Sequence, residues 1–227
     1  MRPQILAHRG ASGHQLENSR AAFRRAVQLE ADGVELDVHA TRDGALIVHH
    51  DAEVPGWGPI AALTLAQLGP ARLPNGEPLP ELGEVLDIMQ GRTVWIEVKA
   101  LDPAFDGALL AAIDASPTPA GCAVHSFDHR IVERLGRARP GLSLGALLAA
   151  RVVDPAAVLV AARAGVLWQE WRMIDEALVR QVRDAGHRVV AWTVDSAADI
   201  ERLAHMGVDA ICTNFPDRAR TALGPLR

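Results

Sequence analysis

The sequence predicts an α/β protein, a (β/α)₈ TIM barrel formed by a single domain over residues 1–227, and three observations support this fold class. Short apolar runs rich in Val, Ile and Leu alternate with longer segments of helical periodicity, which is typical of parallel strands joined by helices. About eight such units follow one another, and eight is the number that closes a barrel. A chain of 227 residues, 49% of them hydrophobic, can bury a core of this size.

The strands are expected where apolar and β-branched residues gather in short runs. These runs are residues 4–8, 33–39, 93–99, 122–127, 142–147, 166–171, 188–194 and 209–213. In the run 166–171, alternation turns one of Trp168 and Trp171 toward the barrel interior and the other toward the helices. An open doubly wound sheet is the alternative architecture. It is disfavoured because no Gly-x-Gly-x-x-Gly motif follows the first run.

Capping residues mark where the helices between these strands begin and end. Asp102 and Asp154 each precede a proline, so an acceptor stands at the N-cap and proline at the first helical position. Gly165, Gly186 and Gly207 each stand just before or near the next strand, where a left-handed glycine commonly ends a helix. We therefore expect helices that stop shortly before the last three strands.

One stretch interrupts this regular alternation. Residues 51–80 are rich in proline and glycine and follow another strand-like run at residues 45–50. We expect a short loop insertion after the second barrel strand. Loops at the C-terminal ends of barrel strands carry the active sites of such enzymes, so this insertion is predicted to border a site.

Composition and charge exclude several other classes of protein. Lys and Arg number 23 against 28 Asp and Glu, a net charge of −5 that gives no electrostatic basis for nucleic-acid binding. The two cysteines, Cys122 and Cys212, lie far apart in apolar runs, so a disulfide framework is not expected. The first residues lack the apolar core of a signal peptide, and no run of 18 apolar residues occurs. A cytoplasmic protein without stable membrane insertion is expected, and its oligomeric state is left open.

Carboxylates placed on expected strands are the most informative feature of the sequence. Glu35 and Asp37 stand two residues apart, so they share one face of a strand while the apolar residues between and beside them take the other. Two buried carboxylates repel each other unless one is protonated or both bind a cation. Glu97 and Lys99 repeat this spacing on the next barrel strand. Three converging carboxylates favour Mg²⁺ or Ca²⁺ over zinc.

Other interpretations of these charges remain open at this point. Glu35 and Asp37 would also fit an exposed edge strand of alternating polarity. Lys99 could form an internal ion pair with a carboxylate or reach an anionic substrate, but the ion pair alone leaves Glu35 and Asp37 uncompensated.

Histidine and arginine side chains at the same strand ends indicate phosphoryl chemistry. His8 ends the first strand and is followed by Arg9, and His50 ends the strand-like run before the insertion. Two imidazoles can remove one proton and supply another near neutral pH. Arg9 offers a bidentate donor suited to phosphate. His125, on the fourth expected strand, faces either this pocket or the core.

The motifs follow one another in a recognisable order. They are His8-Arg9-Gly10, Glu17-Asn18-Ser19, Glu35-Leu36-Asp37, Arg42-Asp43-Gly44, His49-His50-Asp51, Ile96-Glu97-Val98-Lys99, Ser126-Phe127-Asp128, Trp192-Thr193-Val194 and Thr213-Asn214-Phe215-Pro216. In this order the chain resembles the glycerophosphodiester phosphodiesterase family over almost its whole length. The resemblance implies a TIM barrel that hydrolyses glycerophosphodiesters, small soluble molecules, to glycerol 3-phosphate and an alcohol.

The resemblance also implies roles for individual residues. One divalent ion, Mg²⁺ or Ca²⁺ and possibly Mn²⁺, would be bound by three carboxylates, and two histidines would form the acid–base pair. The implied assignments are Glu35, Asp37 and Glu97 for the metal, His8 and His50 for catalysis, Arg9 and Lys99 for the phosphate, Trp192 for the glycerol pocket, and Glu17 as a supporting group near the metal and His8.

Some positions depart from the family pattern, and some questions stay open. Leu16 stands where the family usually has proline. Ser19 stands where it usually has threonine, and serine keeps the hydroxyl that can cap a helix. Asn214 stands where the family usually has Asp, which removes a negative charge near the rim. The sequence does not decide which histidine is the acid and which is the base. It also does not decide whether water or a neighbouring hydroxyl is the nucleophile. Alternative functions are a lysophospholipase D-like or sphingomyelinase D-like phosphodiesterase, a metal-dependent sugar isomerase, and a non-catalytic metal- or phosphate-binding barrel.

Overall fold

Eight parallel strands close into a barrel in the computed structural model, which describes residues 2–224. The strands are β1 (Gln4–His8), β2 (Gly33–Ala40), β6 (Thr93–Ala100), β7 (Cys122–Ser126), β8 (Ser143–Leu148), β9 (Val166–Glu170), β10 (Arg188–Trp192) and β11 (Ala210–Thr213). Each strand pairs in parallel with its neighbours, and β1 pairs with both β2 and β11, which closes the ring. The predicted TIM barrel is confirmed.

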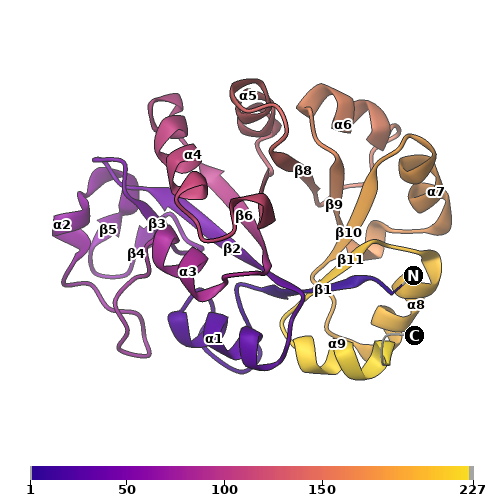
Figure 1. Cartoon of the computed structure of the whole chain (residues 1–227), viewed down its shortest axis with the longest axis horizontal. Coiled ribbons are helices and arrows are strands. Elements are labelled where there is room, and N and C mark those ends of the chain that lie inside the picture. The colour runs from indigo at the N-terminus through magenta and orange to yellow at the C-terminus, as the bar shows by residue number, and fades with distance from the viewer. Residues whose placement is uncertain (1, 225–227) are drawn as a thin grey trace.

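Helices cover the outside of the barrel (Figure 1). They are α1 (Arg20–Gln28), α3 (Leu82–Ile88), α4 (Asp106–Asp114), α5 (His129–Ala138), α6 (Pro155–Ala162), α7 (Glu176–Asp184), α8 (Ala197–Met206) and α9 (Pro216–Leu223). Asp154 caps α6 by accepting a hydrogen bond from the backbone of Ala157, and Gly207 ends α8 in the left-handed region, as predicted. Gly165 does not end α6. That helix ends at Arg163, which itself adopts a φ of 56°.

Strand alternation divides the apolar residues between two cores. Outward-facing residues such as Ile5 and Ala7 pack against the helices, whereas inward-facing residues such as Leu6 fill the barrel. The interior cluster consists of Leu6, Trp95, Ala123, Leu147, Val166, Trp168, Val190, Ala210 and Cys212. Trp168 is buried inside the barrel, while Trp171 packs against the outer core from a short 3₁₀ helix (Trp171–Met173). The two tryptophans therefore face opposite sides, as the alternation predicts.

The insertion after β2 is more ordered than the sequence indicates. It contains β3 (Leu46–Val48), which pairs antiparallel with the end of β2, the hairpin of β4 (Glu53–Val54) and β5 (Gly58–Pro59), the 3₁₀ turn Ile60–Ala62 and α2 (Leu65–Leu68). Widely spaced apolar residues give it a small core of its own, formed by Ile47, Val54, Ile60, Leu68, Ala71, Leu73 and Leu79. The insertion expected at residues 51–80 is present, and it contains short elements that the sequence did not predict because its apolar residues lack any periodicity.

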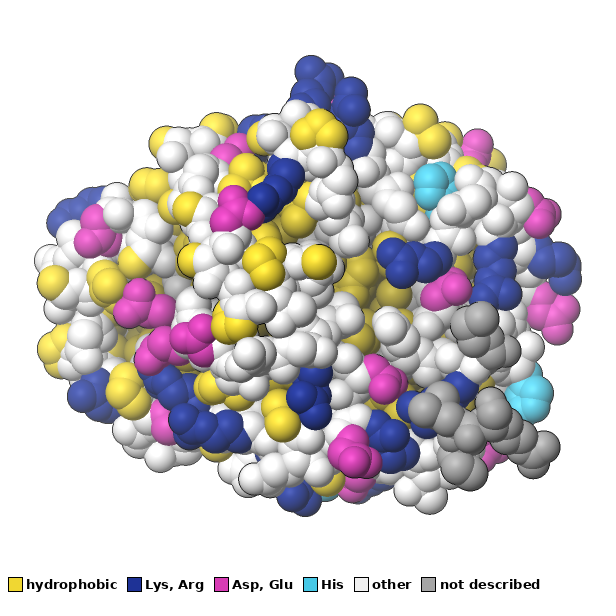
Figure 2. Space-filling view, in the orientation of Figure 1, with side chains coloured by type: hydrophobic (Ala, Val, Ile, Leu, Met, Phe, Trp, Pro, Cys, Tyr) yellow, Lys and Arg dark blue, Asp and Glu magenta, His cyan; other side chains and the backbone are white. Residues whose placement is uncertain are grey.

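Charged side chains of both signs are intermixed on the face seen in Figure 2. Their arrangement gives that face no continuous stripe of a single sign. Among the described residues, no helix has the length and apolar character needed to cross a bilayer.

Candidate active site

Strand register brings the predicted site residues to one end of the barrel. His8 on β1 stands beside Glu35 on β2, and Asp37 on β2 stands beside Glu97 on β6. Glu97 in turn stands beside His125 on β7. Residues paired across parallel strands point the same way, so these five side chains converge near the C-terminal ends of the strands. Barrel enzymes carry their active sites at this end.

Three carboxyl groups form the centre of this cluster. Glu35, Asp37 and Glu97 are buried, and each offers an oxygen that lies within 4.8 Å of those of the other two. Their exclusion from water would be unfavourable for three negative charges without compensation. An oxygen-only donor set of this size fits a hard divalent cation such as Mg²⁺ or Ca²⁺.

Two basic side chains partly balance the carboxyl groups. The Lys99 Nζ atom lies 2.8 Å from Asp37 Oδ1 and 2.6 Å from Glu97 Oε1, and Arg9 Nε lies 3.0 Å from Asp37 Oδ2. Burial alone would raise the pKa of Asp37, but the charges of Lys99 and Arg9 lower it. Burial alone would lower the pKa of Lys99, but the negative charges of Asp37 and Glu97 raise it. Both basic residues are therefore charged, and Asp37 is ionised.

The negative charges of the other two carboxyls, Glu35 and Glu97, are less well balanced by positive charge. Burial, followed by the charges of Asp37 and Glu97, raises the pKa of Glu35 well above its usual range. Burial also raises the pKa of Glu97, although Lys99 opposes the shift. Three carboxyls thus face two basic side chains, and the cluster lacks one positive charge when all are ionised. A divalent cation would remove this deficit, which is a second reason why the donor set fits such an ion.

A chain of hydrogen bonds fixes the orientation of His8. Its Nδ1 atom lies 2.8 Å from Asn214 Oδ1, which also accepts from the hydroxyl of Ser12. The Asn214 amide donates through Nδ2 to Asp195 at 2.7 Å, so its oxygen must face His8. Because an amide oxygen only accepts, the proton of neutral His8 stands on Nδ1. Its Nε2 atom, 3.9 Å from Glu35, is then free to accept a proton.

Burial and the charge of Arg9 lower the pKa of His8 to about 4. The hydrogen bond to Asn214 and the charge of Asp37 oppose this shift without reversing it. His8 is therefore neutral at physiological pH, which is the state a general base requires.

A cavity of about 110 Å³ joins most of the predicted residues. Its lining consists of His8, Arg9, Glu35, His50, Glu97, Lys99, His125, Phe127, Leu147, Trp168 and Trp192. His50 comes from the loop after β3, and its Nδ1 atom lies 2.8 Å from Asp51 Oδ1. Trp192, at the end of β10, meets Phe127 edge-to-face with 5.6 Å between ring centroids. Both predicted histidines thus border one cavity.

Two predicted residues stand outside this lining. Asp37 lies behind it, fully buried beneath Arg9 and Lys99. Glu17 is 45% exposed and binds Arg9 Nη1 with both carboxylate oxygens, at 2.9 and 3.0 Å. The contact of Glu17 in this structure is therefore with Arg9.

Two further polar residues belong to the site: Asn18, to which the sequence assigned no role, and His125, for which it left the pocket and the core as alternatives. Asn18 donates to Asp37 Oδ2 at 2.8 Å, and its neighbour Ser19 caps α1. His125 is buried with both ring nitrogens lacking a hydrogen-bond partner among residues 2–224, and its Nε2 atom lies 3.9 Å from Glu35. Burial keeps its pKa well below the usual range. The strand alternation that placed Glu97 inward could have placed His125 inward as well.

A glycine makes room for the aromatic floor of the cavity. The His125 and Trp168 rings are 4.1 Å apart between centroids. A Cβ atom at Gly145 on β8 would lie 2.8 Å from Trp168 and 3.1 Å from His125. Close packing of these rings therefore requires glycine at this position.

The chain is similar to known proteins over almost its whole length. The profile of the glycerophosphoryl diester phosphodiesterase family matches residues 8–218. A glycerophosphodiester phosphodiesterase of Caldanaerobacter subterraneus subsp. tengcongensis is 33% identical over 96% of each chain. A Bacillus subtilis enzyme of the same name is 28% identical over 93% of this chain and 83% of its own.

Solved structures show the same fold. A glycerophosphodiester phosphodiesterase from Parabacteroides distasonis superposes with a TM-score of 0.86 at 25% identity, covering 98% of this chain and 97% of the other. A phosphodiesterase from Oleispira antarctica, solved with its product sn-glycerol-3-phosphate, gives a TM-score of 0.84 at 23% identity over 98% and 97%. The extent of the profile match, together with a relative 33% identical over 96% of the chain, places this phosphoric diester hydrolase in the glycerophosphoryl diester phosphodiesterase family.

Proposed function

We propose that the protein hydrolyses glycerophosphodiesters to glycerol 3-phosphate and an alcohol, with a bound divalent metal ion and two histidines as the acid–base pair. The observation that carries this proposal is the meeting of three buried carboxyls, two basic side chains and two histidines at one cavity. The product bound to the Oleispira antarctica relative supports the same choice of substrate.

Glu35, Asp37 and Glu97 are the residues that would hold the metal ion. Their oxygens suit Mg²⁺, Ca²⁺ or Mn²⁺. When bound, such an ion stabilises negative charge on phosphate oxygens in the transition state. Asn18 supports the set by donating to Asp37 at 2.8 Å.

Arg9 and Lys99 would bind the phosphate of the substrate. Both side chains border the cavity and also contact Asp37, so their positive charges stay at a fixed place. Glu17 holds the Arg9 guanidinium from its other side. Fixed cationic donors in a partly dehydrated cavity stabilise developing charge without reorganising during the reaction.

His8 would act as the general base and His50 as the general acid. His8 is neutral and presents Nε2 without a proton, so it can accept the proton of the attacking hydroxyl, whether that belongs to water or to the substrate. The Asp51 carboxylate, 2.8 Å from His50 Nδ1, orients this imidazole, which would protonate the leaving alcohol. Trp192, with Phe127 against it, would form the wall that contacts the glycerol carbons.

The test is hydrolysis of glycerophosphocholine by the purified protein. We expect glycerol 3-phosphate and choline as products, loss of turnover in EDTA, and recovery with Mg²⁺, Ca²⁺ or Mn²⁺. Turnover that is indifferent to EDTA would remove the metal from the proposal. Absence of glycerol 3-phosphate with metal present would refute the proposed reaction.

Replacing Asn214 tests how His8 is positioned. Asn214→Leu removes the oxygen that accepts the Nδ1 proton, so His8 can rotate or adopt the other tautomer. We expect kcat to fall about 100-fold with a smaller change in KM, since loss of alignment can cost that much. Asn214→Asp, which keeps an acceptor, should retain more activity than Asn214→Leu. Equal activity of wild type and Asn214→Leu would contradict this role.

A further inference from the structure

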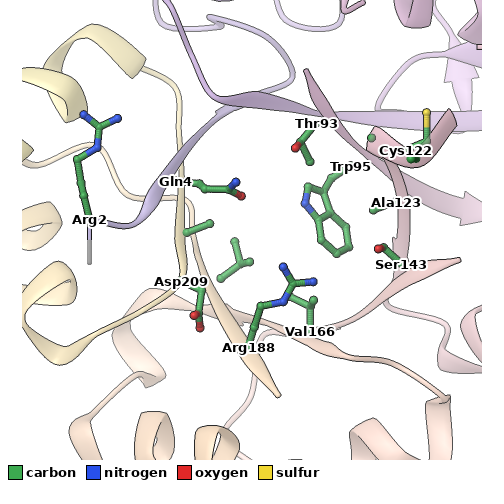
Figure 3. A pocket seen from close by; sticks show the side chains of 14 residues that line it. Arg2, Gln4, Thr93, Trp95, Cys122, Ala123, Ser143, Val166, Arg188 and Asp209 are labelled. Atoms are coloured by element: carbon green, nitrogen blue, oxygen red, sulfur yellow. The ribbon is translucent and has the colours of Figure 1, made fainter. Parts of the chain in front are cut away.

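A second cavity opens at the opposite end of the barrel. It has a volume of about 370 Å³ and lies where the strands begin, so it is separate from the active site. Figure 3 shows side chains from the starts of several strands around it. Gln4 comes from β1, Thr93 from β6, Ser143 from β8, Val166 from β9 and Arg188 from β10.

Strand alternation places a charged side chain inside this mouth. Arg188, Val190 and Trp192 are alternate residues of β10 and share its inward face. Val190 belongs to the interior cluster and Trp192 borders the active-site cavity, so Arg188 points into the barrel from its other end. Arg188, the first residue of β10, is exposed at the rim of this mouth, so its guanidinium is accessible to a ligand there.

The Arg188 guanidinium has no ion pair and no side-chain hydrogen bond within residues 2–224. The other charged groups of the lining are already paired. Asp209 lies 3.2 Å from Arg183, and Arg2 lies 3.3 Å from Asp32. The second cavity therefore carries one uncompensated positive charge from the part of the chain that the structure describes.

A hydrogen-bond donor from a buried residue points into the same space. Trp95 is only 5% exposed, and its indole N–H has no acceptor among the described residues. Figure 3 shows the indole nitrogen turned toward the cavity, on the side of Gln4 and Thr93, with the Arg188 guanidinium reaching in from β10. This N–H is open to the cavity rather than sealed from it, so an acceptor bound in the cavity can receive its hydrogen bond.

Apolar side chains complete the lining. Ala123, Val166, Val190 and Ala210 belong to the interior cluster and also border the second cavity. A ligand there would meet both hydrogen-bond donors and hydrocarbon. This combination suits an anionic group attached to a short carbon chain.

We propose that this N-terminal mouth of the barrel binds a small organic oxyanion, a carboxylate or a phosphate ester. Arg188 binds the anionic group through charge-assisted hydrogen bonds, and the Trp95 indole N–H donates to it. Gln4 and Thr93 offer further hydrogen bonds, and the carbon atoms rest against Val166 and Val190. The site is independent of the proposed hydrolysis at the other end of the barrel.

Indole N–H resonances provide a direct test, because the chain has five tryptophans and each gives one such signal. Trp95→Phe identifies the Trp95 signal in the ¹⁵N-labelled protein. Propanoate and methyl phosphate are then titrated as probes. We expect a saturable downfield shift of the Trp95 signal with at least one probe, and the probe that binds more tightly identifies the anionic group. The Trp192 signal separately reports binding at the active site.

Arg188→Gln is the decisive variant. It should weaken the response of the Trp95 signal about tenfold or more, because a charged donor is lost. Hydrolysis of glycerophosphocholine should stay at the wild-type rate, and unchanged signals from the other tryptophans confirm the fold. A Trp95 signal that responds to neither probe would overturn the proposal. A response that is equally strong in Arg188→Gln would overturn it as well.

Discussion

His8→Ala is expected to lower kcat for glycerophosphocholine by about 10²–10⁴-fold, the range typical for loss of a general base. The structure gives the reason. His8 is neutral, carries its proton on Nδ1 and presents Nε2 beside Glu35. Among the described histidines that line the cavity, only His8 combines a fixed tautomer with an Nε2 atom beside Glu35. Neither ring nitrogen of His125 has a hydrogen-bond partner, and His50 instead bonds Asp51.

Steady-state kinetics with metal in excess measure this effect. His205→Ala is the matched control, because His205 is an exposed residue of α8 that bonds only the Glu201 backbone. It should leave kcat unchanged. The thermal midpoint of His8→Ala should stay close to wild type if the loss is chemical. A His8→Ala variant that turns over at nearly the wild-type rate would exclude His8 as the base.

Glu35→Gln is expected to act in opposite directions on stability and on metal binding. Glu35 is buried beside Asp37 and Glu97, and burial together with their repulsion raises its pKa well above the usual range. Removing its charge relieves that repulsion in the metal-free protein. It also removes a metal ligand, which should weaken metal affinity by more than the roughly 10–100-fold typical of supporting residues.

The pH dependence of stability follows from the same pKa shift. Folded Glu35 holds its proton more tightly than unfolded Glu35 does, so ionising it disfavours the folded state. The free energy of unfolding of metal-free wild type should therefore fall as the pH rises from the ordinary glutamate pKa toward the raised one. In Glu35→Gln this contribution is absent.

Urea unfolding in EDTA across this pH range measures the stability of the metal-free protein. Calorimetric titration with Mn²⁺ measures its metal affinity. Glu53→Gln, at an exposed position in the insertion, is the control and should change neither. If Glu35→Gln bound Mn²⁺ as tightly as wild type, Glu35 would not be a ligand. If it destabilised the metal-free protein above the ordinary glutamate pKa, the repulsion would not be the dominant interaction of Glu35.

The fold could be predicted because its signals are local and repeated. Each strand is a short, largely apolar run, and alternation decides which side chains share a face. The sequence alone therefore assigns Glu35 and Asp37 to the inward face of one strand and Glu97 to that of the next. Strand register then makes the three carboxyls neighbours. The positions of His8 and His50 at strand ends suggested two imidazoles near one rim, and the family resemblance then implied that they form the acid–base pair.

Contacts between distant loops could not be predicted in this way. The bond from His8 to Asn214 joins residues 206 apart, and the support from Asp195 depends on how the last two barrel strands end. The insertion resembles an irregular loop in its sequence because its small core is built from apolar residues without a period. The inward position of Arg188 is equally hard to recognise, since a charged residue at the start of a strand resembles an ordinary surface position.

We propose that three carboxyls on two adjacent strands bind one divalent ion. A crystal grown with Mn²⁺, with diffraction data collected at a wavelength that gives anomalous signal from manganese, tests it most directly. We expect one strong anomalous peak within bonding distance of oxygens of Glu35, Asp37 and Glu97. A peak elsewhere, or none at these residues with Lys99 still bridging Asp37 and Glu97, would contradict it.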